Sequence, residues 1–391
     1  MEIIISLLLL YFTFNACYWL FFSLSGLFYT TLSPKEKSGD LSSFLVLIPA
    51  YKEDGVIESV VKENLNQNYP KEKFDIIVIA DSFQEDTLKR LEHYPVELLV
   101  VEFEQSTKVK ALNAAFESLK RDYEYAMILD ADNVMAPNCL MEMHKVFSAA
   151  KVQAVQGQRT AKNDNTSMAV LDGISEAINN HIYRSGHAAV GMSCPLIGSG
   201  MAFEFHLVKR ILNEMISVGG FDRELELRLL RENVSVKYQA TAITFDEKIQ
   251  NTSGFYNQRR RWISTQFVYL KKYFFEALML LMKGNLSFFD NAVIRNLQLP
   301  RLLFLGLMGL FTLLALIIPQ FVGPFSDWVK ICIITLLSIV VAFPRRMLNR
   351  KLFGAILLLP KTFLLMLLAL LKVKGANKKF IHTTHSSNNV K

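Results

Sequence analysis

Cysteine is scarce in this chain of 391 residues, and its spacing argues against two kinds of structure. No two cysteines form a CxxC pair, so neither a disulfide framework nor a zinc site is indicated, and we expect reduced thiols. Glycine-rich phosphate loops are missing too, because neither GxGxxG nor GxxxxGK[ST] occurs in the sequence. A dinucleotide fingerprint and a P-loop are therefore not indicated. The four cysteines are Cys17, Cys139, Cys194 and Cys332.

Charged side chains are absent from long stretches at both ends of the chain. Residues 3–29, about 27 residues, contain none, which exceeds the roughly 20 residues that cross a bilayer as a helix. The stretch lacks the small-residue cleavage site of a secretory signal, so it predicts a first transmembrane helix. Residues 302–318 and 329–343 are apolar apart from Lys330, and the intervening PQFVGPFSDW predicts the turn of a membrane hairpin.

Lysine and arginine gather on both sides of the last apolar stretch, residues 352–371. The flanking segments, RRMLNRK at 345–351 and KVKGANKK at 372–379, should both be cytoplasmic by the positive-inside rule. That placement favours a re-entrant or in-plane stretch over a further span. We therefore predict a multi-pass integral protein of the cell or inner membrane, with residues 32–300 and the tail in the cytoplasm.

The net charge of +7 also bears on the partners of the protein. Basic segments beside a membrane attract anionic lipid, so we expect a membrane partner and no nucleic acid. A transporter is disfavoured, because the predicted membrane stretches contain no acidic residue.

The hydrophilic middle of the chain alternates between two patterns. Continuous apolar runs at 43–51, 74–81, 96–103 and 125–129 predict buried strands, and helical spacing follows the first and third of them. This alternation predicts an α/β fold with a largely parallel sheet and helices on both faces. Ligands of such sheets gather at the carboxyl ends of the strands.

Acidic residues stand at those strand ends. Glu53 follows the first strand, Asp81 ends the second, and Asp130 and Asp132 follow the fourth. Two like charges so close need water or a cation, and Mg²⁺ and Mn²⁺ take carboxylate oxygens while leaving positions open for phosphates. By itself the Asp-x-Asp pair also fits a solvated turn. In a series of strand-end acids it predicts a bridge between metal and diphosphate.

Seven stretches follow one another in an order typical of a known family. They resemble the motifs of membrane-bound family 2 glycosyltransferases, the group of cellulose, hyaluronan and poly-N-acetylglucosamine synthases and of ceramide glucosyltransferase. The stretches are VLIPAYKED (46–54), VIADSFQEDT (78–87), TKVKALNAAF (107–116), ILDADN (128–133), GSGMAF (198–203), GGFDRELELRLL (219–230) and QRRRW (258–262).

The resemblance implies a Rossmann-like GT-A domain in the cytosol, inserted between transmembrane helices. Together with the apolar stretches it divides the chain into five parts. These are an N-terminal transmembrane helix (1–31), the GT-A domain (32–255), amphipathic interfacial helices (256–300), C-terminal membrane segments (301–373) and a basic cytosolic tail (374–391).

Carried over residue by residue, the resemblance implies a site for a nucleotide-sugar, its metal and an acceptor. Asp130 and Asp132 would hold Mg²⁺ or Mn²⁺, with Asp132 as the direct ligand. Ser199, Gly200 and Trp262 would contact the acceptor. The residues implied to bind the donor are Tyr51, Glu53, Asp81, Lys108, Asp130, Gln258, Arg261 and Trp262.

Asp222 matches the catalytic base of the family. A base is needed because an inverting transfer removes a proton from the attacking hydroxyl. Phe221 departs from the pattern, since relatives carry an acidic or small polar residue there. Glu224 is the alternative base, although Glu224 and Glu226 also fit a solvated helix face.

The resemblance implies an inverting, metal-dependent transferase that uses a nucleotide-sugar, with UDP as the expected nucleotide. The predicted acceptor is a growing polysaccharide at the cytosolic membrane face. Two alternatives stay open, which are transfer of a single sugar to a membrane lipid and a catalytically inactive scaffold.

Overall fold

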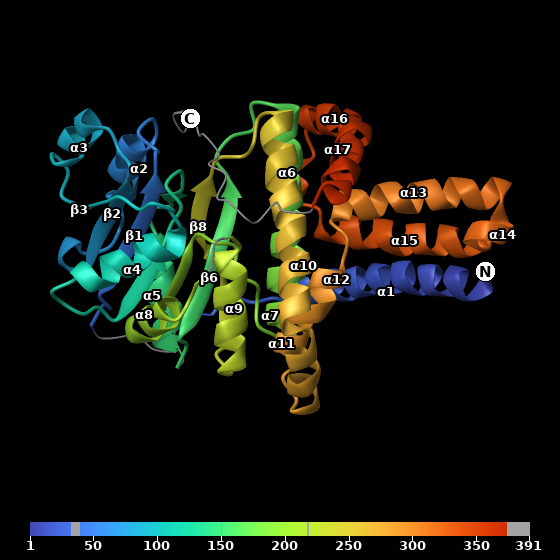
Figure 1. Ribbon diagram of the computed structural model, residues 1–391, viewed down its shortest axis with the longest axis horizontal. Helices are drawn as coiled ribbons and strands as arrows, with labels where there is room; N and C mark the ends of the chain where they lie inside the picture. The colour runs from blue at the N-terminus through green and yellow to red at the C-terminus, as the bar shows by residue number, and fades with distance from the viewer. Residues whose placement is uncertain (33–39, 150, 217–218, 374–391) are drawn as a thin grey trace.

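One mixed sheet of eight strands organises the hydrophilic part of the protein (Figure 1). The computed structural model describes residues 1–32, 40–149, 151–216 and 219–373, so the basic tail predicted at 374–391 lies outside the described residues. The strands are β1 (Phe44–Tyr51), β2 (Phe74–Asp81), β3 (Glu97–Val101), β4 (Tyr125–Ile128), β5 (Val134–Met135), β6 (Ala154–Ala161), β7 (Met201–Glu204) and β8 (Val236–Asp246).

The strand order is β3-β2-β1-β4-β7-β6-β8-β5. The neighbours among β3, β2, β1 and β4 are parallel, as the sequence predicts, and so are β6 and β8. β7 runs antiparallel to both β4 and β6, and the short β5 runs antiparallel to β8. Six strands therefore end at one edge of the sheet, where Tyr51, Asp81, Asp130 and Asp246 collect.

Helices cover both faces of the sheet. The apolar side chains of β1 alternate, so Leu45 and Leu47 join the core on one face while Val46 and Ile48 join the core on the other. Helices α4 (Lys108–Ser118), α8 (Phe205–Asn213) and α9 (Phe221–Arg231) contribute to the first core. Helices α2 (Ile57–Asn64), α3 (Glu85–Leu91) and α5 (Cys139–Ala149) contribute to the second. The predicted three-layer α/β arrangement is confirmed.

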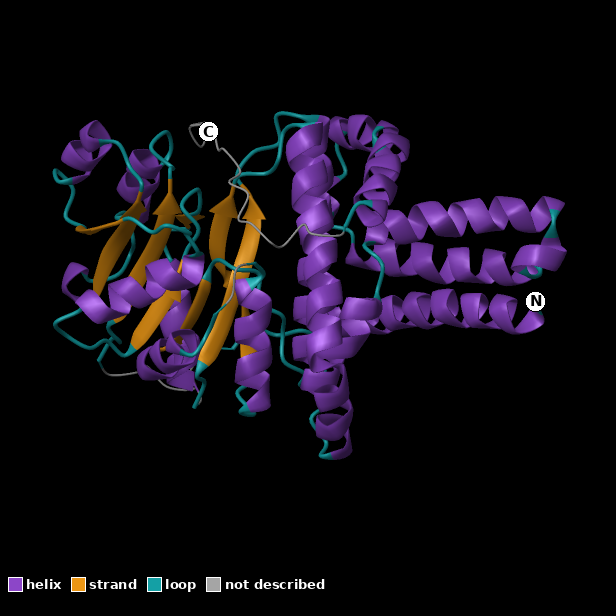
Figure 2. Ribbon diagram, viewed as in Figure 1, coloured by secondary structure: helices purple, strands orange, loops and turns teal. Residues whose placement is uncertain are grey.

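A layer of helices separates this sheet from the apolar helices (Figure 2). The longest is α10 (Thr252–Met282), whose far half exposes Phe267, Phe275 and Met282. QRRRW lies within α10, because helix already begins at Thr252. The rest of the layer is α6 (Ser167–Asn179), the π-helix η2 (Asn180–Ser185), α7 (Gly186–Ala189), α11 (Leu286–Phe289), the π-helix η3 (Asp290–Ile294) and α12 (Arg295–Leu297).

Three apolar helices run side by side away from the sheet (Figure 1). They are α1 (Glu2–Gly26), α13 (Arg301–Ile317) and α15 (Phe325–Ala342), and α13 and α15 form the predicted hairpin through α14 (Pro319–Val322). By length and composition α1 and α15 can each cross a membrane. Two bent pairs qualify if each counts as one span, namely 286–297 with α13 and α16 (Arg350–Leu357) with α17 (Leu359–Leu371).

Buried polar groups fasten α1 to the helical layer. The Tyr18 hydroxyl donates to Asp290 Oδ1 at 2.7 Å and lies 2.9 Å from His187 Nε2. His187 Nε2 lies 3.2 Å from Asp290 Oδ2, and Phe22 stacks on the His187 ring. His187 follows η2 by two residues, and Asp290 is the first residue of η3. Both segments are π-helices, whose hydrogen bonds join residues five apart instead of four.

The cysteines form no disulfide, as predicted. Burial raises the pKa of the Cys139 and Cys194 thiols to about 12. Both remain protonated at neutral pH and act as small core side chains.

Candidate active site

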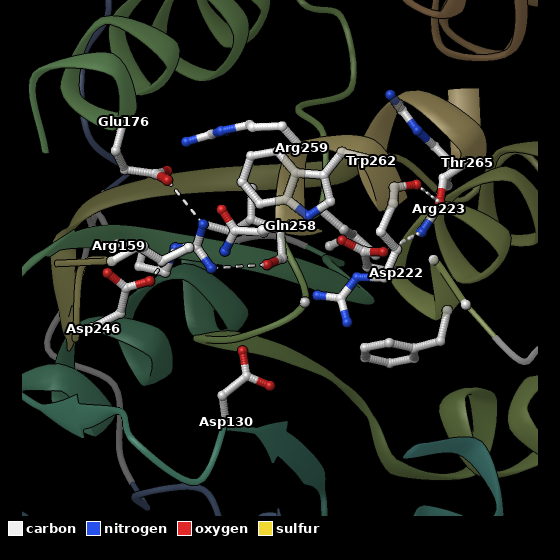
Figure 3. Close-up of a pocket in the computed structure, with 18 of the residues that line it drawn as sticks. Asp130, Arg159, Glu176, Asp222, Arg223, Asp246, Gln258, Arg259, Trp262 and Thr265 are labelled. Atoms are coloured by element: carbon white, nitrogen blue, oxygen red, sulfur yellow. Dashed lines mark hydrogen bonds and ion pairs between the residues drawn. The ribbon is translucent and has the colours of Figure 1, made fainter. Parts of the chain in front are cut away.

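A cavity of about 600 Å³ extends from the carboxyl edge of the sheet to the start of the apolar helices. That volume suits a ligand the size of a sugar nucleotide, since small-molecule sites span about 300–1,000 Å³. Figure 3 shows Asp130 on the sheet side and Gln258, Trp262 and Asp222 across from it. The predicted site residues that line the cavity are Tyr51, Glu53, Asp81, Lys108, Asp130, Asp132, Asp222, Gln258, Arg261 and Trp262.

One end of the cavity is built on the ends of β1 and β2. Tyr51 and Asp81 are partners in the strand register, so the pairing places them next to each other. Asp81 accepts a hydrogen bond from the Ser82 hydroxyl at 2.9 Å. The chain leaves both strands through left-handed residues, Lys52 at φ 54° and Ser82 at φ 59°. Non-glycine residues rarely adopt this conformation, and those that do are enriched at active sites.

Asp130 and Asp132 occupy the turn after β4. Asp132 is buried, and its Oδ2 accepts from the backbone N–H of Glu247 at 3.2 Å. Asp130 forms an ion pair with Lys108, whose Nζ also donates to the carbonyl of Gly198 at 2.7 Å. The described residues contain no cluster of three metal-ligating side chains. Two carboxylates suit a hard divalent cation that fills its other positions with water and substrate oxygens.

Ser199 and Gly200 do not line the cavity, unlike the acceptor contacts expected of them. Ser199 is fully buried, and its hydroxyl accepts from the backbone N–H of Asp130 at 2.9 Å and from Asn133 Nδ2 at 2.6 Å. Gly200 has φ 63°, and a Cβ there would meet Thr244 Oγ1 at 2.7 Å. Ser199 therefore holds the Asp-x-Asp turn in shape, while the preceding Gly198 reaches the cavity.

Asp222 lies in the first turn of α9 and faces the cavity. Its Oδ1 accepts from the backbone N–H of Arg223 at 2.9 Å, and the helix N-terminus favours its negative charge. A Cβ on Gly198, which has φ 85°, would lie 3.5 Å from Asp222 Oδ2. Glycine at this position leaves that oxygen accessible from the cavity.

Phe221, the departure from the family pattern, supports Lys108. The Lys108 ammonium lies 4.7 Å from the centre of the Phe221 ring, within the range of a cation–π contact. The aromatic ring thus helps to position the cation that pairs with Asp130. Nothing about Phe221 displaces Asp222 from the cavity.

Glu224 and Glu226 are buried, so their assignment to a solvated helix face is wrong. Glu224 turns away from the cavity toward α10, where Lys272 and Tyr273 donate to it at 2.8–2.9 Å. Burial raises the pKa of Glu224, but the hydrogen bonds from Lys272, Arg228 and Tyr273 outweigh this and lower it. The packing of α10 over α9 joins segments about 50 residues apart and buries Glu224, whereas Glu226 contacts Arg295 and the backbone N–H of Leu196.

Glu226 stands behind Asp222 among arginines. It lies 3.1 Å from Arg295 and 3.8 Å from Arg223. Burial raises the pKa of Glu226, and the nearby Asp222 carboxylate raises it further. Arg295 and Arg223 lower this pKa, but their effect is the smaller one. Burial and the charge of Arg295 lower the pKa of Arg223 to about 10, so Arg223 stays protonated at neutral pH.

The QRRRW segment divides between two faces of α10. Gln258, Arg259, Arg261 and Trp262 line the cavity, as helical spacing of three to four residues allows, whereas Arg260 donates to the backbone carbonyl of Lys372 at 2.5 Å. The Arg259 guanidinium pairs with Asp172 and lies 4.2 Å from the Trp262 ring. Arg261 forms no ion pair within the described chain, and burial lowers its pKa despite Asp222 and Asp130.

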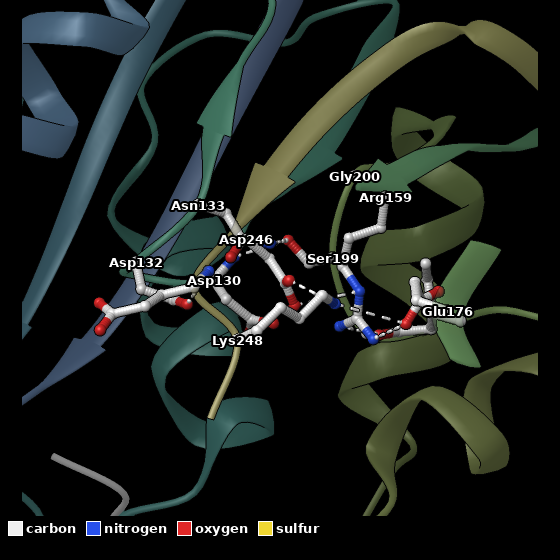
Figure 4. Close-up of polar contacts among 12 residues, drawn as sticks. Asp130, Asp132, Asn133, Arg159, Glu176, Ser199, Gly200, Asp246 and Lys248 are labelled. Atoms are coloured by element: carbon white, nitrogen blue, oxygen red, sulfur yellow. Dashed lines mark hydrogen bonds and ion pairs between the residues drawn. The ribbon is translucent and has the colours of Figure 1, made fainter. Parts of the chain in front are cut away.

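A buried ion network that the sequence interpretation missed forms another wall of the cavity (Figure 4). Arg159 contacts Glu176 at 2.8 Å and Asp246 at 3.3 Å, and Lys248 contacts Asp246 at 2.5 Å. Burial raises the pKa of Glu176, but Arg159, Lys248 and Arg184 outweigh it and lower the pKa far below its usual range. Asp246 ends β8, so the strand-end rule that found Asp81 would have found it too. No sequence signal marks Arg159.

The sheet, with its strand-end acids beside one cavity, has the GT-A fold. The solved structure of the mannosyltransferase PcManGT from Pyrobaculum calidifontis, in complex with GDP-Man and Mn²⁺, matches with a TM-score of 0.53 and 17% identity. The match covers 85% of this chain and 98% of that one, which shows the fold.

The family model described as glycosyltransferase-like family 2 matches residues 42–265, and the chain belongs to this family. The probable glycosyltransferase YdaM of Bacillus subtilis is 24% identical over 61% of this chain and 58% of its own length. The beta-monoglucosyldiacylglycerol synthase of Trichormus variabilis is 23% identical over 58% of this chain and 50% of its own length. The chain thus spans about half the length of these relatives.

Proposed function

We propose that the protein moves a sugar from a UDP-sugar to a lipid acceptor at the cytosolic face of a membrane, with inversion at the anomeric carbon. One observation carries the proposal. A single cavity joins the Asp-x-Asp turn, Asp222 and the first residues of the apolar helix α13. A donor and a membrane-embedded acceptor can therefore meet at one carboxylate.

The donor would lie along the sheet edge. Tyr51, Glu53 and Asp81 would surround the nucleoside, and Asp130 and Asp132 would hold Mg²⁺ or Mn²⁺ beside the diphosphate. When bound, the cation neutralises charge on the departing diphosphate. Lys108 and Arg261 would hold phosphate oxygens, and Arg261 suits this because it has no carboxylate partner within the described chain. The Mn²⁺ and GDP-Man of the PcManGT structure support a metal-dependent nucleotide-sugar site.

Asp222 would act as the general base. Its carboxylate would take the proton of the acceptor hydroxyl while that oxygen attacks the anomeric carbon, and the bond to the diphosphate oxygen would break on the opposite side. The position of Asp222 Oδ2 next to Gly198 in the cavity lining supports this role, since a base must reach the proton that it removes.

Two observations support a lipid as the acceptor. The cavity reaches Leu299, Leu302 and Met366, so its far end includes an apolar wall and borders helices predicted to lie in the membrane. The similarity to a beta-monoglucosyldiacylglycerol synthase adds weight to a glycolipid product.

A growing polysaccharide remains the second candidate, because one observation favours it. Trp262 is 40% exposed and lines the cavity beside Asp222, where an indole ring could stack on an acceptor sugar.

The test is product analysis with the purified full chain in lipid vesicles, a panel of radiolabelled nucleotide-sugars, and Mn²⁺, Mg²⁺ or chelator. We expect metal-dependent incorporation of one UDP-sugar into a chloroform-soluble product of a single added mass. Label retained in water-soluble or precipitable polymer would establish the polysaccharide instead. No release of nucleotide from any donor, with vesicles present, would establish the inactive scaffold.

A further inference from the structure

We propose that the membrane-side end of the cavity binds the phosphate of a phosphate-bearing lipid acceptor through Arg301, Gln298 and the first turn of α13. The inference rests on the proposed function and names the class of lipid that enters the site. It starts from polar groups that the rest of the site does not use.

Arg301 is a cation without an anion. It is the first residue of α13 and lines the cavity, and its Nη2 donates to Asn179 Oδ1. Within the described chain it forms no ion pair, and its Nη1 is buried without a hydrogen-bond partner. Burying one nitrogen of an arginine without a partner is costly, so an arginine in that state in a substrate cavity indicates an anionic ligand.

Other arginines of this region already have carboxylate partners. Arg259 pairs with Asp172, Arg159 and Arg184 pair with Glu176, and Arg295 pairs with Glu226. Arg261 forms no ion pair within the described chain either, but it lines the cavity within reach of the charges of Asp222 and Asp130, where the donor diphosphate is expected. Arg301 is therefore the arginine left for another anion, and it lies at the start of the apolar helix α13 rather than beside the sheet.

Gln298 supplies a second unused donor. Its side chain is only 5% exposed and lines the cavity, and its Oε1 accepts from the Tyr183 hydroxyl at 2.8 Å. That bond fixes the amide so that Nε2 is the free group, and Nε2 is buried without a partner. Helix α13 begins in the same place with no side-chain cap, and its first N–H groups favour an anion.

The surroundings favour a lipid phosphate over a free one. Leu299, Leu302, Phe255 and Met366 line the cavity around the polar groups, and they come from α10, α13, α17 and the segment before α13. An acyl chain can lie against these side chains while its phosphate meets Arg301. The acceptor hydroxyl would then extend past Trp262 toward Asp222.

The experiment measures binding of radiolabelled dioctanoyl phosphatidic acid to the purified full chain in neutral detergent, without donor. Dioctanoylglycerol, which lacks the phosphate, and inorganic phosphate serve as competitors. We expect phosphatidic acid to bind about 10- to 100-fold more tightly than dioctanoylglycerol, the range that charge-assisted hydrogen bonds supply. Arg301→Gln should remove this preference, and Arg301→Lys should keep part of it. The matched control is Arg350→Gln, an exposed arginine at the start of α16, which should bind as the parent does.

Binding of UDP with Mn²⁺ reports on the fold of each variant and on the donor site separately. Equal affinity for the two lipids, or a preference that survives Arg301→Gln in a protein that still binds UDP, would overturn the inference. Competition by inorganic phosphate at the concentration of the lipid would also overturn it, by showing a free-anion site. Because no turnover is measured, a failure of sugar transfer would contradict the proposed function and leave this result standing.

Discussion

Two acids in one helix turn show how the surroundings of a residue decide its role. Asp222 and Glu224 both lie at the start of α9, and the sequence offers either as the base. Asp222 lines the cavity, while Glu224 is bound by Lys272, Tyr273 and Arg228 from outside it. A carboxylate already engaged by three donors is a poor proton acceptor. The geometry therefore favours Asp222.

Asp222→Asn should lower the rate of sugar transfer by roughly 10²–10⁴, because the amide keeps the size of the side chain but cannot take a proton. UDP binding in Mn²⁺ should stay at the parent level, since other carboxylates hold the donor. Glu224→Gln should retain transfer. If Asp222→Asn stays active while Glu224→Gln is inactive, Glu224 is the base instead of Asp222.

Asp132→Ala should weaken Mn²⁺-dependent UDP binding by more than about 100-fold, because even indirect supports of a metal ligand are worth about 10- to 100-fold. Equilibrium binding with and without chelator measures the effect. The control is Asp86→Ala, an exposed acid of α3. If UDP binds the parent equally well in chelator, the role of the metal in donor binding is wrong.

At the scale of elements, α9 and α10 are joined by the buried carboxylate of Glu224. Its lowered pKa means that this contribution to stability is present above the pKa of an unfolded glutamate and disappears as the pH falls through the lower folded value. Hydrogen bonds to charged groups contribute about 1.5–3 kcal/mol each, so the contacts of Glu224 with α10 outweigh its burial.

Glu224→Gln should therefore lower the free energy of unfolding by about 1–3 kcal/mol at pH 7. The difference from the parent should shrink below about pH 4.5, where the parent carboxylate also becomes neutral. Thermal unfolding in detergent across that pH range measures it. A difference that grows on acidification would contradict the assignment of Glu224 as an ionised link.

The sequence predicts those elements whose pattern is local. β1, β2 and β3 are continuous apolar runs, and their pairing follows from the alternation of strands and helices. β7 could not be placed in this way, because its insertion between β4 and β6 depends on pairing with strands distant in sequence. Burial of Glu226 and the ion network around Arg159 depend likewise on tertiary packing. Strand-end acids were predictable because topology alone collects them at one edge.

At the scale of the whole molecule, the apolar helices divide into two sets. α1, α13 and α15 form the bundle, while α17 packs against α10 and the side of α13. Arg260 reaches the backbone of Lys372, which places the end of α17 beside the QRRRW helix. This contact agrees with the charge pattern, which predicts that residues 32–300 and the tail share the cytoplasmic side.

Single cysteines at Glu92, Ser326 and Lys372, all exposed positions, test this arrangement with a membrane-impermeant maleimide. We expect label at Ser326 in intact cells, and label at Glu92 and Lys372 only after permeabilisation. The parent without an added cysteine sets the background. Label at Lys372 in intact cells would show that the α16–α17 pair crosses the bilayer.

The contact of Tyr18 with His187 and Asp290 has a consequence for proteolysis. A cut between α1 and the sheet would leave α1 held by noncovalent contacts alone, and its departure would remove the Tyr18 hydroxyl from two polar groups buried beside the helical layer. Their loss of a partner would loosen η3, and Arg295 just after it, which holds Glu226 behind Asp222. Cleavage there would leave α13 and α15 attached to the sheet domain, so its expected effect is a disturbed base at Asp222 and slower transfer rather than release from the membrane.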